Sequence, residues 1–358
     1  MNKLTTFTLT ALLLVLLTAL PARAAERTTV GAIRWDAWFV DTVNPYETNL
    51  ADKQWHGRLP FFAEIISGTN VQVRGDTQAA VDQEIAYAKA GGVDYWAFLY
   101  YSPGLRKDGF NHDFMNRARR LYLSSKRKGD VNFCLIVNPK HPDKEIGEWL
   151  EMMREPTYQK VGGGRPLIYF MFWDPHDTVE RHFGSVEKGR AYMDRLRERI
   201  KQTGQPNPYL VTLSQTPAVG AAVVKAAGLD AISAYTSWGG PDYAGLCAAQ
   251  VKHWDAMRAT GAQVVPNVSA GWGGPRDKNG DRLQPKPGEL AAHVRSAFAW
   301  IDANPGATEA RTMLFYAWNE VDEGGWLIPD KGRGTAKLDE IRKVADERKK
   351  VKATTGTR

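Results

Sequence analysis

Cysteine is scarce in this sequence. Only Cys134 and Cys247 occur among the 358 residues, so disulfide bonds cannot be the main source of stability. A chain of this length can bury a sufficient core without cross-links. Cys134 lies in an apolar run and Cys247 on a stretch of helical character. We expect free, buried thiols, with a disulfide in an oxidising compartment as the alternative.

Nucleotide-binding and metal-binding motifs are missing. The sequence has no Walker A motif, and residues 40–42, which follow the first apolar run, contain no G-x-G-x-x-G pattern. The histidines form neither an H-x-x-x-H pair nor a His-Asp-Ser set. Asp277, Asn279 and Asp281 have the spacing of calcium ligands, but Arg282 occupies the position that requires glycine. We therefore predict no metal and no cofactor.

Charge of one sign is not concentrated anywhere in the fold. Lys and Arg number 47 against 40 Asp and Glu, a formal net charge of +7. These cations are scattered, and their densest cluster is at residues 348–350. Basic side chains interleaved with aromatic ones, as nucleic-acid binders have, are absent, so no nucleic-acid partner is expected. The positive balance mildly favours an acidic substrate or an anionic surface.

Long apolar runs are confined to the N-terminus. Lys3 precedes the apolar residues 9–20, and Ala22-Arg23-Ala24 is typical of a signal-peptidase site. No other run is long enough to span a bilayer. We therefore predict that residues 1–24 are a signal peptide and that the mature protein begins at Ala25, without a membrane span. The expected location is periplasmic or secreted.

After the signal peptide, strand-like and helix-like segments alternate. The strand-like runs are nearly continuously apolar, as in parallel sheets buried on both faces. They lie at residues 30–39, 94–101, 131–138, 165–173, 209–215, 230–238, 263–272 and 311–319. The helix-like segments lie at residues 77–90, 111–128, 143–154, 188–202, 219–227, 243–259, 288–303 and 336–350. About eight strand-helix units predict an α/β fold, a single (β/α)8 TIM barrel with extended βα loops.

An open, doubly wound sheet is the alternative fold, but it usually carries a Gly-rich turn after its first strand, which this chain lacks. No linker or low-complexity segment divides the chain. We therefore predict one barrel domain over residues 25–350, a flexible tail over residues 351–358, and a monomer.

The apolar run at residues 313–326 breaks into two carboxylates, Glu320 and Glu323, before the pair Gly324-Gly325. Two carboxylates in one pocket shift each other's pKa, which makes one a proton donor and the other a base. Glycines let the chain curl, so we predict that the strand ends before Val321 and that both carboxylates face the barrel mouth. The alternative is that they begin a solvated loop or cap a helix.

Aromatic and amide side chains gather where the predicted strands end, which is where a barrel places its active site. Flat rings bind the C–H faces of sugars, and polar groups bind their hydroxyl edges, so this set fits a carbohydrate better than an apolar ligand. The predicted substrate-binding residues of this kind are Asp36, Trp38, Tyr100, Tyr101, Asn138, Tyr235, Trp238, Asn267, Trp272, Trp318, Asn319 and Trp326.

Several of these residues have a structural alternative. Tyr100 and Trp35 could equally be core residues. Asp174, which precedes a proline, is more typical of a turn or an N-cap. A buried, unpaired carboxylate is unfavourable, so Asp36 should either face the mouth or meet Arg34.

Residues 318–330 resemble the W-N-E-W-x-E-G-x-x-L-E-P segment of glycoside hydrolase family 99 and its relatives, which include glycosyltransferase-like proteins of polysaccharide biosynthesis; family 71 is also similar. Residues 271–276 resemble the G-W-D-N-T-P-R loop of that group, which adds Arg276 to the expected substrate-binding residues. Residues 83–101 and 164–169 resemble its first helix, second strand and G-K-P-x-x-Y strand.

The resemblance implies a (β/α)8 barrel in which Glu320 and Glu323 are catalytic. The first glutamate would assist the substrate's own 2-hydroxyl in displacing the leaving group, and the second would act as acid and then as base, unlike the ordinary two-carboxylate schemes. The sequence departs from the family at Val321 and Asp322, at Ile328, and in the loop at residues 271–276, where two glycines replace polar residues.

Two functions are consistent with these residues. The first is an exported glycoside hydrolase that cleaves a polysaccharide or oligosaccharide. The alternative is a non-hydrolytic carbohydrate-binding or glycosyltransferase-like protein of surface-polysaccharide assembly. Export favours the hydrolase, because sugar nucleotides are cytoplasmic.

Overall fold

The computed structural model describes residues 27–39, 44–107, 110–276 and 280–355. The predicted signal peptide and two of the calcium-spaced residues, Asp277 and Asn279, lie outside this part of the chain. Within the described residues no helix combines the length and the apolar character that a bilayer crossing requires.

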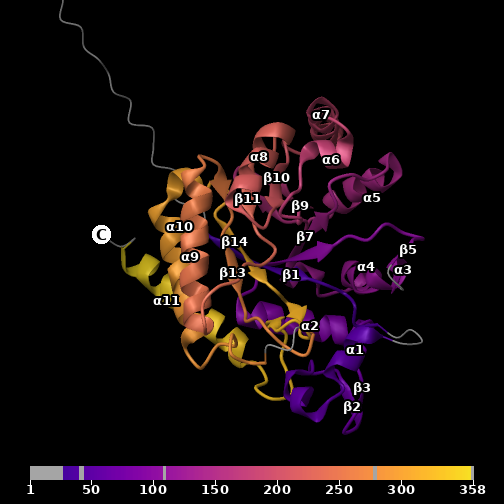
Figure 1. Cartoon of the computed structure of the whole chain (residues 1–358), viewed down its shortest axis with the longest axis vertical. Helices are drawn as coiled ribbons and strands as arrows, with labels where there is room; N and C mark the ends of the chain where they lie inside the picture. Colours follow the sequence, from indigo (N-terminus) through magenta and orange to yellow (C-terminus); the bar gives the residue numbers. More distant parts are fainter. Residues whose placement is uncertain (1–26, 40–43, 108–109, 277–279, 356–358) are drawn as a thin grey trace, which may run out of the picture.

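The core of the protein is a parallel sheet surrounded by helices (Figure 1). Its strands are β1 (Thr29–Arg34), β4 (Tyr95–Leu99), β7 (Asn132–Val137), β9 (Arg165–Met171), β10 (Tyr209–Leu213), β11 (Ala231–Ser233), β12 (Gln263–Val264), β13 (Asn267–Ser269) and β14 (Thr312–Tyr316). The helices that follow them are α2 (Gln78–Gly91), α4 (Arg117–Ser124), α5 (Asp143–Met153), α7 (Val186–Gln202), α8 (Pro217–Ala227), α9 (Tyr243–Ala259), α10 (Glu289–Ala303) and α11 (Ala336–Thr355).

The sheet closes into a barrel through one interrupted strand. β12 pairs with β11, and β13 pairs with β14, which pairs with β1. β12 and β13 are halves of one strand, separated only by Val265 and Pro266, since a proline has no N–H for the sheet. Counted as one strand, they complete eight βα units. The predicted (β/α)8 fold is therefore confirmed.

The loops between these elements contain shorter helices and strands. They are α1 (Pro45–Leu50), a 3-10 helix (Lys53–Arg58), β2 (Glu64–Ser67), β3 (Asn70–Gln72), β5 (Arg106–Lys107), β6 (Phe110–Asn111), α3 (His112–Met115), β8 (Lys160–Val161), α6 (Val179–Phe183), β15 (Asn319–Glu320), β16 (Gly325–Trp326) and two further 3-10 turns (Lys128–Asp130 and Pro305–Ala307).

Helix limits agree with the predicted segments except in two places. The segment at residues 111–128 is split at Asn116, whose side-chain Nδ2 donates to the carbonyl of Tyr101 at 2.8 Å. The last helix continues to Thr355, so residues 351–355 of the predicted tail are helical. Elsewhere local signals act as expected: Thr77 caps α2 by accepting from the N–H of Ala80, and Gly92 ends it with a φ of 82°.

The side chains that fill the barrel interior show which residues of each strand point inward. Gly31 lies beside Tyr95, and a Cβ on Gly31 would lie 2.0 Å from the Tyr95 ring, so only glycine fits there. The Tyr95 hydroxyl bonds Thr312 Oγ1 at 3.0 Å and the Tyr169 hydroxyl at 2.9 Å across the interior. Because side chains alternate along a strand, the residues two and four places further on point inward above this layer.

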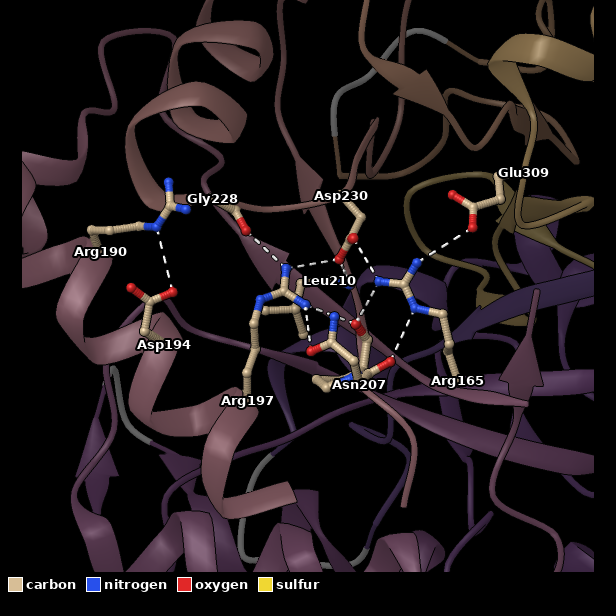
Figure 2. A network of polar contacts seen from close by, with 10 residues as sticks. Arg165, Arg190, Asp194, Arg197, Asn207, Leu210, Gly228, Asp230 and Glu309 are labelled. Carbon is tan, nitrogen blue, oxygen red and sulfur yellow. Dashed lines mark hydrogen bonds and ion pairs between the residues drawn. The ribbon is translucent and has the colours of Figure 1, made fainter. Parts of the chain in front are cut away.

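Charged residues form a network at the N-terminal ends of the barrel strands (Figure 2). The Asp230 carboxylate, just before β11, accepts from Arg165 Nη2 at 2.6 Å and from Arg197 Nη2 at 2.9 Å. It also accepts from the N–H of Leu210 in β10 at 2.8 Å. This network joins β9, β10 and α7 at the N-terminal ends of the strands, the face that serves stability in such barrels.

Candidate active site

A pocket of about 330 Å³ opens at the C-terminal ends of the barrel strands. Aromatic rings and two carboxylates form most of its wall. The lining residues are Trp35, Tyr46, Leu99, Met171, Trp173, Tyr235, Thr236, Trp272, Arg276, Glu320 and Glu323. Both glutamates that the sequence singles out therefore border one cavity.

A tight hairpin brings the two glutamates to the pocket. β14 ends at Tyr316, and β15 then pairs antiparallel with β16, so the strand ends before Val321 as predicted. Gly324, in the turn, has a φ of 90°, and a Cβ there would lie 2.1 Å from the carbonyl oxygen of Gly273. Only glycine allows this approach of the hairpin to the loop after β13.

Glu320 is the deeper of the two carboxylates. It is 3% exposed, and its Oε1 accepts a hydrogen bond from the Tyr235 hydroxyl. Burial raises the pKa of Glu320 well above its usual value, and the nearby Glu323 and Asp322 raise it further. The Tyr235 hydroxyl and Arg276 oppose this rise in pKa. Burial and the nearby negative charges thus outweigh the two groups that stabilise its ionised form.

Glu323 lies nearer the mouth and is held by two donors. Its Oε2 accepts from the Tyr316 hydroxyl at 2.5 Å, and its Oε1 forms an ion pair with Arg276. The side chain of Glu323 is 19% exposed and that of Arg276 is 50% exposed. The two glutamates therefore differ in their partners and in their exposure to solvent.

A third carboxylate, Asp322, lies between them in sequence and was not expected at the site. It is fully buried, and its Oδ2 accepts from Asn49 Nδ2 at 3.3 Å. Burial, and then the charge of Glu323, raises the pKa of Asp322 to about 7. Asp322 is therefore one of the groups that raise the pKa of Glu320.

Five aromatic rings form a closed circuit that runs from the partners of the two carboxylates to Trp173, after β9. Trp173 contacts Tyr235 at 5.6 Å between ring centroids, and Tyr235 contacts Tyr316 at 5.5 Å. Tyr316 contacts Trp272 and Trp272 contacts Trp238, both at 5.4 Å. Trp238 closes the circuit on Trp173 at 5.9 Å. These contacts fix the orientation of the rings that border the carboxylates.

Three of the predicted substrate-binding residues line the pocket: Tyr235, Trp272 and Arg276. Trp238 is 45% exposed and packs on Trp173 and Trp272 without lining the cavity. Its exposed ring extends the aromatic surface outward from the pocket.

Asn319 and Trp38 lie behind the pocket and join β1 to the end of β14. The side chain of Asn319 accepts from the N–H of Trp35 at 2.9 Å and donates to its carbonyl at 2.6 Å. Trp38 Nε1 donates to the backbone carbonyl of Asn319 at 2.8 Å. Both amide atoms of Asn319 are thus engaged, and the residue positions Trp35 and Glu320 instead of lining the cavity.

Asp36 and Trp318 belong to a buried charge cluster below the site. Asp36 meets Arg34, as the alternative interpretation expected, at 2.8 Å. Arg34 also pairs with Glu84 of α2 at 3.0 Å, and Trp318 Nε1 donates to Glu84 Oε2 at 2.5 Å. Burial raises the pKa of Glu84 to about 7, against the opposing charge of Arg34. The cluster connects the segment before Glu320 to the barrel wall.

The remaining predicted residues lie outside the cavity lining. Tyr100 is buried and donates to Glu148 Oε2 at 2.8 Å. The Tyr101 hydroxyl accepts from Trp35 Nε1 at 2.8 Å. Asn267 is buried and donates to Ser237 Oγ at 3.0 Å, whereas Asn138 is exposed. Trp326 is buried, and its Nε1 donates to Asp330 Oδ2 at 2.9 Å.

Strand alternation could have identified pocket residues that the prediction left out. Trp35 lies four residues after Gly31, so it shares the inward face. Trp173 likewise follows Tyr169 by four residues. Tyr46, in α1, comes from the loop after β1 and had no such signal.

Metal-ligand clusters are not found among the described residues: no three His, Cys, Asp or Glu side chains lie together in a way that could hold an ion. Cys134 and Cys247 are both free thiols as expected, but only Cys134 is buried, whereas Cys247 is partly exposed.

Comparison with known proteins relates this chain to glycoside hydrolases through its fold. No protein-family model matches the sequence, and no curated protein matches it. The structure is similar to a family 99 endo-α-mannosidase from Bacteroides thetaiotaomicron in complex with BIS-TRIS-propane, with a TM-score of 0.60 and 14% identity over 91% of this chain and 98% of that one. A second structure of this enzyme gives a TM-score of 0.58 and 13% identity over 90% and 98% of the chains. At this identity the likeness establishes a family 99-like fold.

Proposed function

We propose that the protein is an exported glycoside hydrolase that cleaves a glycosidic bond of a polysaccharide or oligosaccharide with Glu320 and Glu323. The observation that carries this proposal is that both carboxylates line one pocket bordered by aromatic rings. Rings bind the apolar faces of sugars, while carboxylates move the protons that hydrolysis requires. The family 99-like fold supports the same class of reaction.

The depth of each carboxylate suggests its role. Glu320 is buried and lines the pocket, so we assign it as the base towards a substrate hydroxyl. Glu323 is more exposed, on the side from which a leaving group would depart, so we assign it as the acid. A raised pKa makes the ionised form of Glu320 a stronger base, so its environment is compatible with this role.

In this scheme the substrate's own 2-hydroxyl attacks the anomeric carbon, as the resemblance to family 99 implies. Glu320 takes the hydroxyl proton, and Glu323 gives its proton to the leaving oxygen as the glycosidic bond breaks. In the second half Glu323 removes a proton from the water that attacks the anomeric carbon, the bond between that carbon and O2 breaks, and Glu320 returns its proton to O2. Arg276 must leave Oε1 of Glu323 before that oxygen can approach the leaving group, and the half-exposed side chain of Arg276 can do so.

The compartment and the domain limits belong to the same proposal. Residues 1–24 would be removed on export, and residues 25–350 would form the barrel of a periplasmic or secreted monomer. A carbohydrate is the only partner that this proposal requires.

A non-hydrolytic carbohydrate-binding or transferase-like protein is the second candidate. The ion pair between Arg276 and Glu323 favours it, because Arg276 occupies an oxygen of the residue that would have to act as the acid.

A glycan panel separates the two candidates. Residues 25–358 are incubated with polysaccharides and oligosaccharides, and new reducing ends are measured beside a Glu320→Gln control. New reducing ends that the control does not produce support the hydrolase. Binding without cleavage supports the second candidate.

A further inference from the structure

The pocket has two chemically different sides. Glu320, Glu323 and Arg276 lie on the polar side, together with Tyr46, which lies near all three. Leu99, Met171 and Trp173 also line the cavity, and all three side chains are partly exposed at their strand ends. Apolar side chains left partly exposed inside a pocket favour an apolar part of a ligand.

The topology places Met171 opposite the carboxylates. The closed sheet runs β14, β1, β4, β7, β9 in one direction and β14, β13–β12, β11, β10, β9 in the other. β9 is therefore four strands from β14 either way round, which is directly across an eight-stranded barrel. Met171 and Trp173 follow the inward face of β9 above Tyr169, while Glu320 and Glu323 follow β14.

Hydrogen-bond acceptors are scarce on the apolar side. Leu99 has no polar side-chain atom, the Met171 thioether is a weak acceptor, and the indole of Trp173 only donates. Thr236 also lines the pocket, but its Oγ1 is buried, and no described residue partners it. A substrate hydroxyl buried against this wall would leave its own O–H unpaired, and an unpaired buried donor is unfavourable.

The proposed reaction determines which edge of the sugar ring faces the apolar side of the pocket. C1 carries the leaving group and C2 the attacking hydroxyl, so both must face Glu320 and Glu323. In a six-membered ring C4 and C5 lie opposite C1 and C2. C6 projects from C5 one atom beyond the ring, so its substituent would extend furthest towards Met171 and Leu99.

We propose that the sugar bound beside Glu320 and Glu323 is a 6-deoxyhexose, whose C6 methyl group packs on the wall formed by Leu99, Met171 and Trp173. This inference rests on the proposed function, because the orientation of the sugar follows from the catalytic roles of the two glutamates. It adds the substrate class to that proposal.

The test uses matched pairs of aryl glycosides that differ only in the hydroxyl at C6, in the manno, gluco and galacto configurations. Because the members of a pair share every other group, the ratio of their kcat/KM values isolates the C6 contact. We expect the 6-deoxy member of the pair that is cleaved best to be favoured about tenfold to a hundredfold, the range in which apolar pockets discriminate against an added hydroxyl. Equal or faster cleavage of the hexoside overturns this inference and leaves the hydrolase proposal intact.

Substitution of a residue in the apolar wall provides the second measurement. Met171→Gln introduces an amide that can pair with a C6 hydroxyl, so the ratio should fall to less than about threefold. Met152→Gln on α5, outside the pocket lining, is the matched control and should retain the ratio. Should Met171→Gln fail to fold, Leu99→Gln makes the same test. An unchanged ratio in a folded wall variant contradicts the proposed contact.

A binding measurement distinguishes a failure of this inference from a failure of the proposed function. Tryptophan fluorescence is titrated with the methyl glycosides of the same pairs. If no aryl glycoside is cleaved but the 6-deoxy methyl glycoside binds about tenfold more tightly, the substrate class holds and the hydrolase proposal fails. If no pair is cleaved or bound, both are overturned.

Discussion

Replacement of Tyr235 by phenylalanine tests how the site controls Glu320. The variant removes one hydroxyl, which donates to Oε1 of Glu320, and keeps the ring that packs between Trp173 and Tyr316. That hydrogen bond stabilises the ionised carboxylate, so the Tyr235 hydroxyl lowers the pKa of Glu320 against the effect of burial. Without it the pKa of Glu320 should rise further.

The size of the change follows from the strength of such bonds. A hydrogen bond to a charged group contributes about 1.5–3 kcal/mol, and one pKa unit corresponds to about 1.4 kcal/mol. The pKa of Glu320 should therefore rise by about one to two units in Tyr235→Phe. Since the proposed base must be ionised, the acidic limb of kcat/KM against pH should move to higher pH by the same amount.

The assay is the pH dependence of kcat/KM on an aryl glycoside that the native protein cleaves. Tyr209→Phe is the matched control, because the Tyr209 hydroxyl is buried, has no partner among the described residues and lies outside the pocket lining. An acidic limb that does not move would refute the reasoning. Movement of the alkaline limb in its place would mean that Glu320 acts as an acid.

Three further predictions concern binding and stability. Trp272→Ala should weaken substrate binding about tenfold, since about 1.5 kcal/mol of aromatic contact is lost; a large fall in melting temperature with normal affinity would make this residue core instead. Asn319→Ala should lower the free energy of unfolding in urea by about 2–4 kcal/mol, because the N–H and carbonyl of Trp35 lose their partners; unchanged stability would argue against this clamp. Asp230→Asn should lower the free energy of unfolding in urea by about 1–2 kcal/mol, because it weakens a partly exposed ion network. Its kcat should stay unchanged, and a fall in kcat would connect this network to the site.

The eight βα units could be predicted because each strand is buried on both faces and therefore reads as a continuous apolar run. The strand ends could not. The segment at residues 30–39 is strand only as far as Arg34, and the segment at residues 230–238 only as far as Ser233. At the barrel mouth the backbone leaves the sheet to direct side chains into the pocket, while the residues stay apolar and aromatic.

The glutamate pair was predictable because it interrupts a hydrophobic strand before two glycines. The sequence alone did not show which residues line the pocket and which support it from behind. Tyr316 lies in an ordinary apolar run, yet it binds Glu323, whereas Asn319 has the composition of a sugar-binding residue and instead secures the backbone of Trp35. That difference depends on which face of a short segment each residue occupies, and the segment's path is set by contacts with β1 and with the loop after β13.

The most direct test of the central claim is the turnover of Glu320→Gln and Glu323→Gln with substrates of different leaving-group ability. Positioned acid and base groups contribute a hundredfold or more, so each variant should lose about that much activity on a natural glycosidic bond with its fold intact. An activated leaving group needs no acid, so it should restore the activity of Glu323→Gln far more than that of Glu320→Gln. Near-normal turnover in both variants would contradict the assignment of this pair as the catalytic residues.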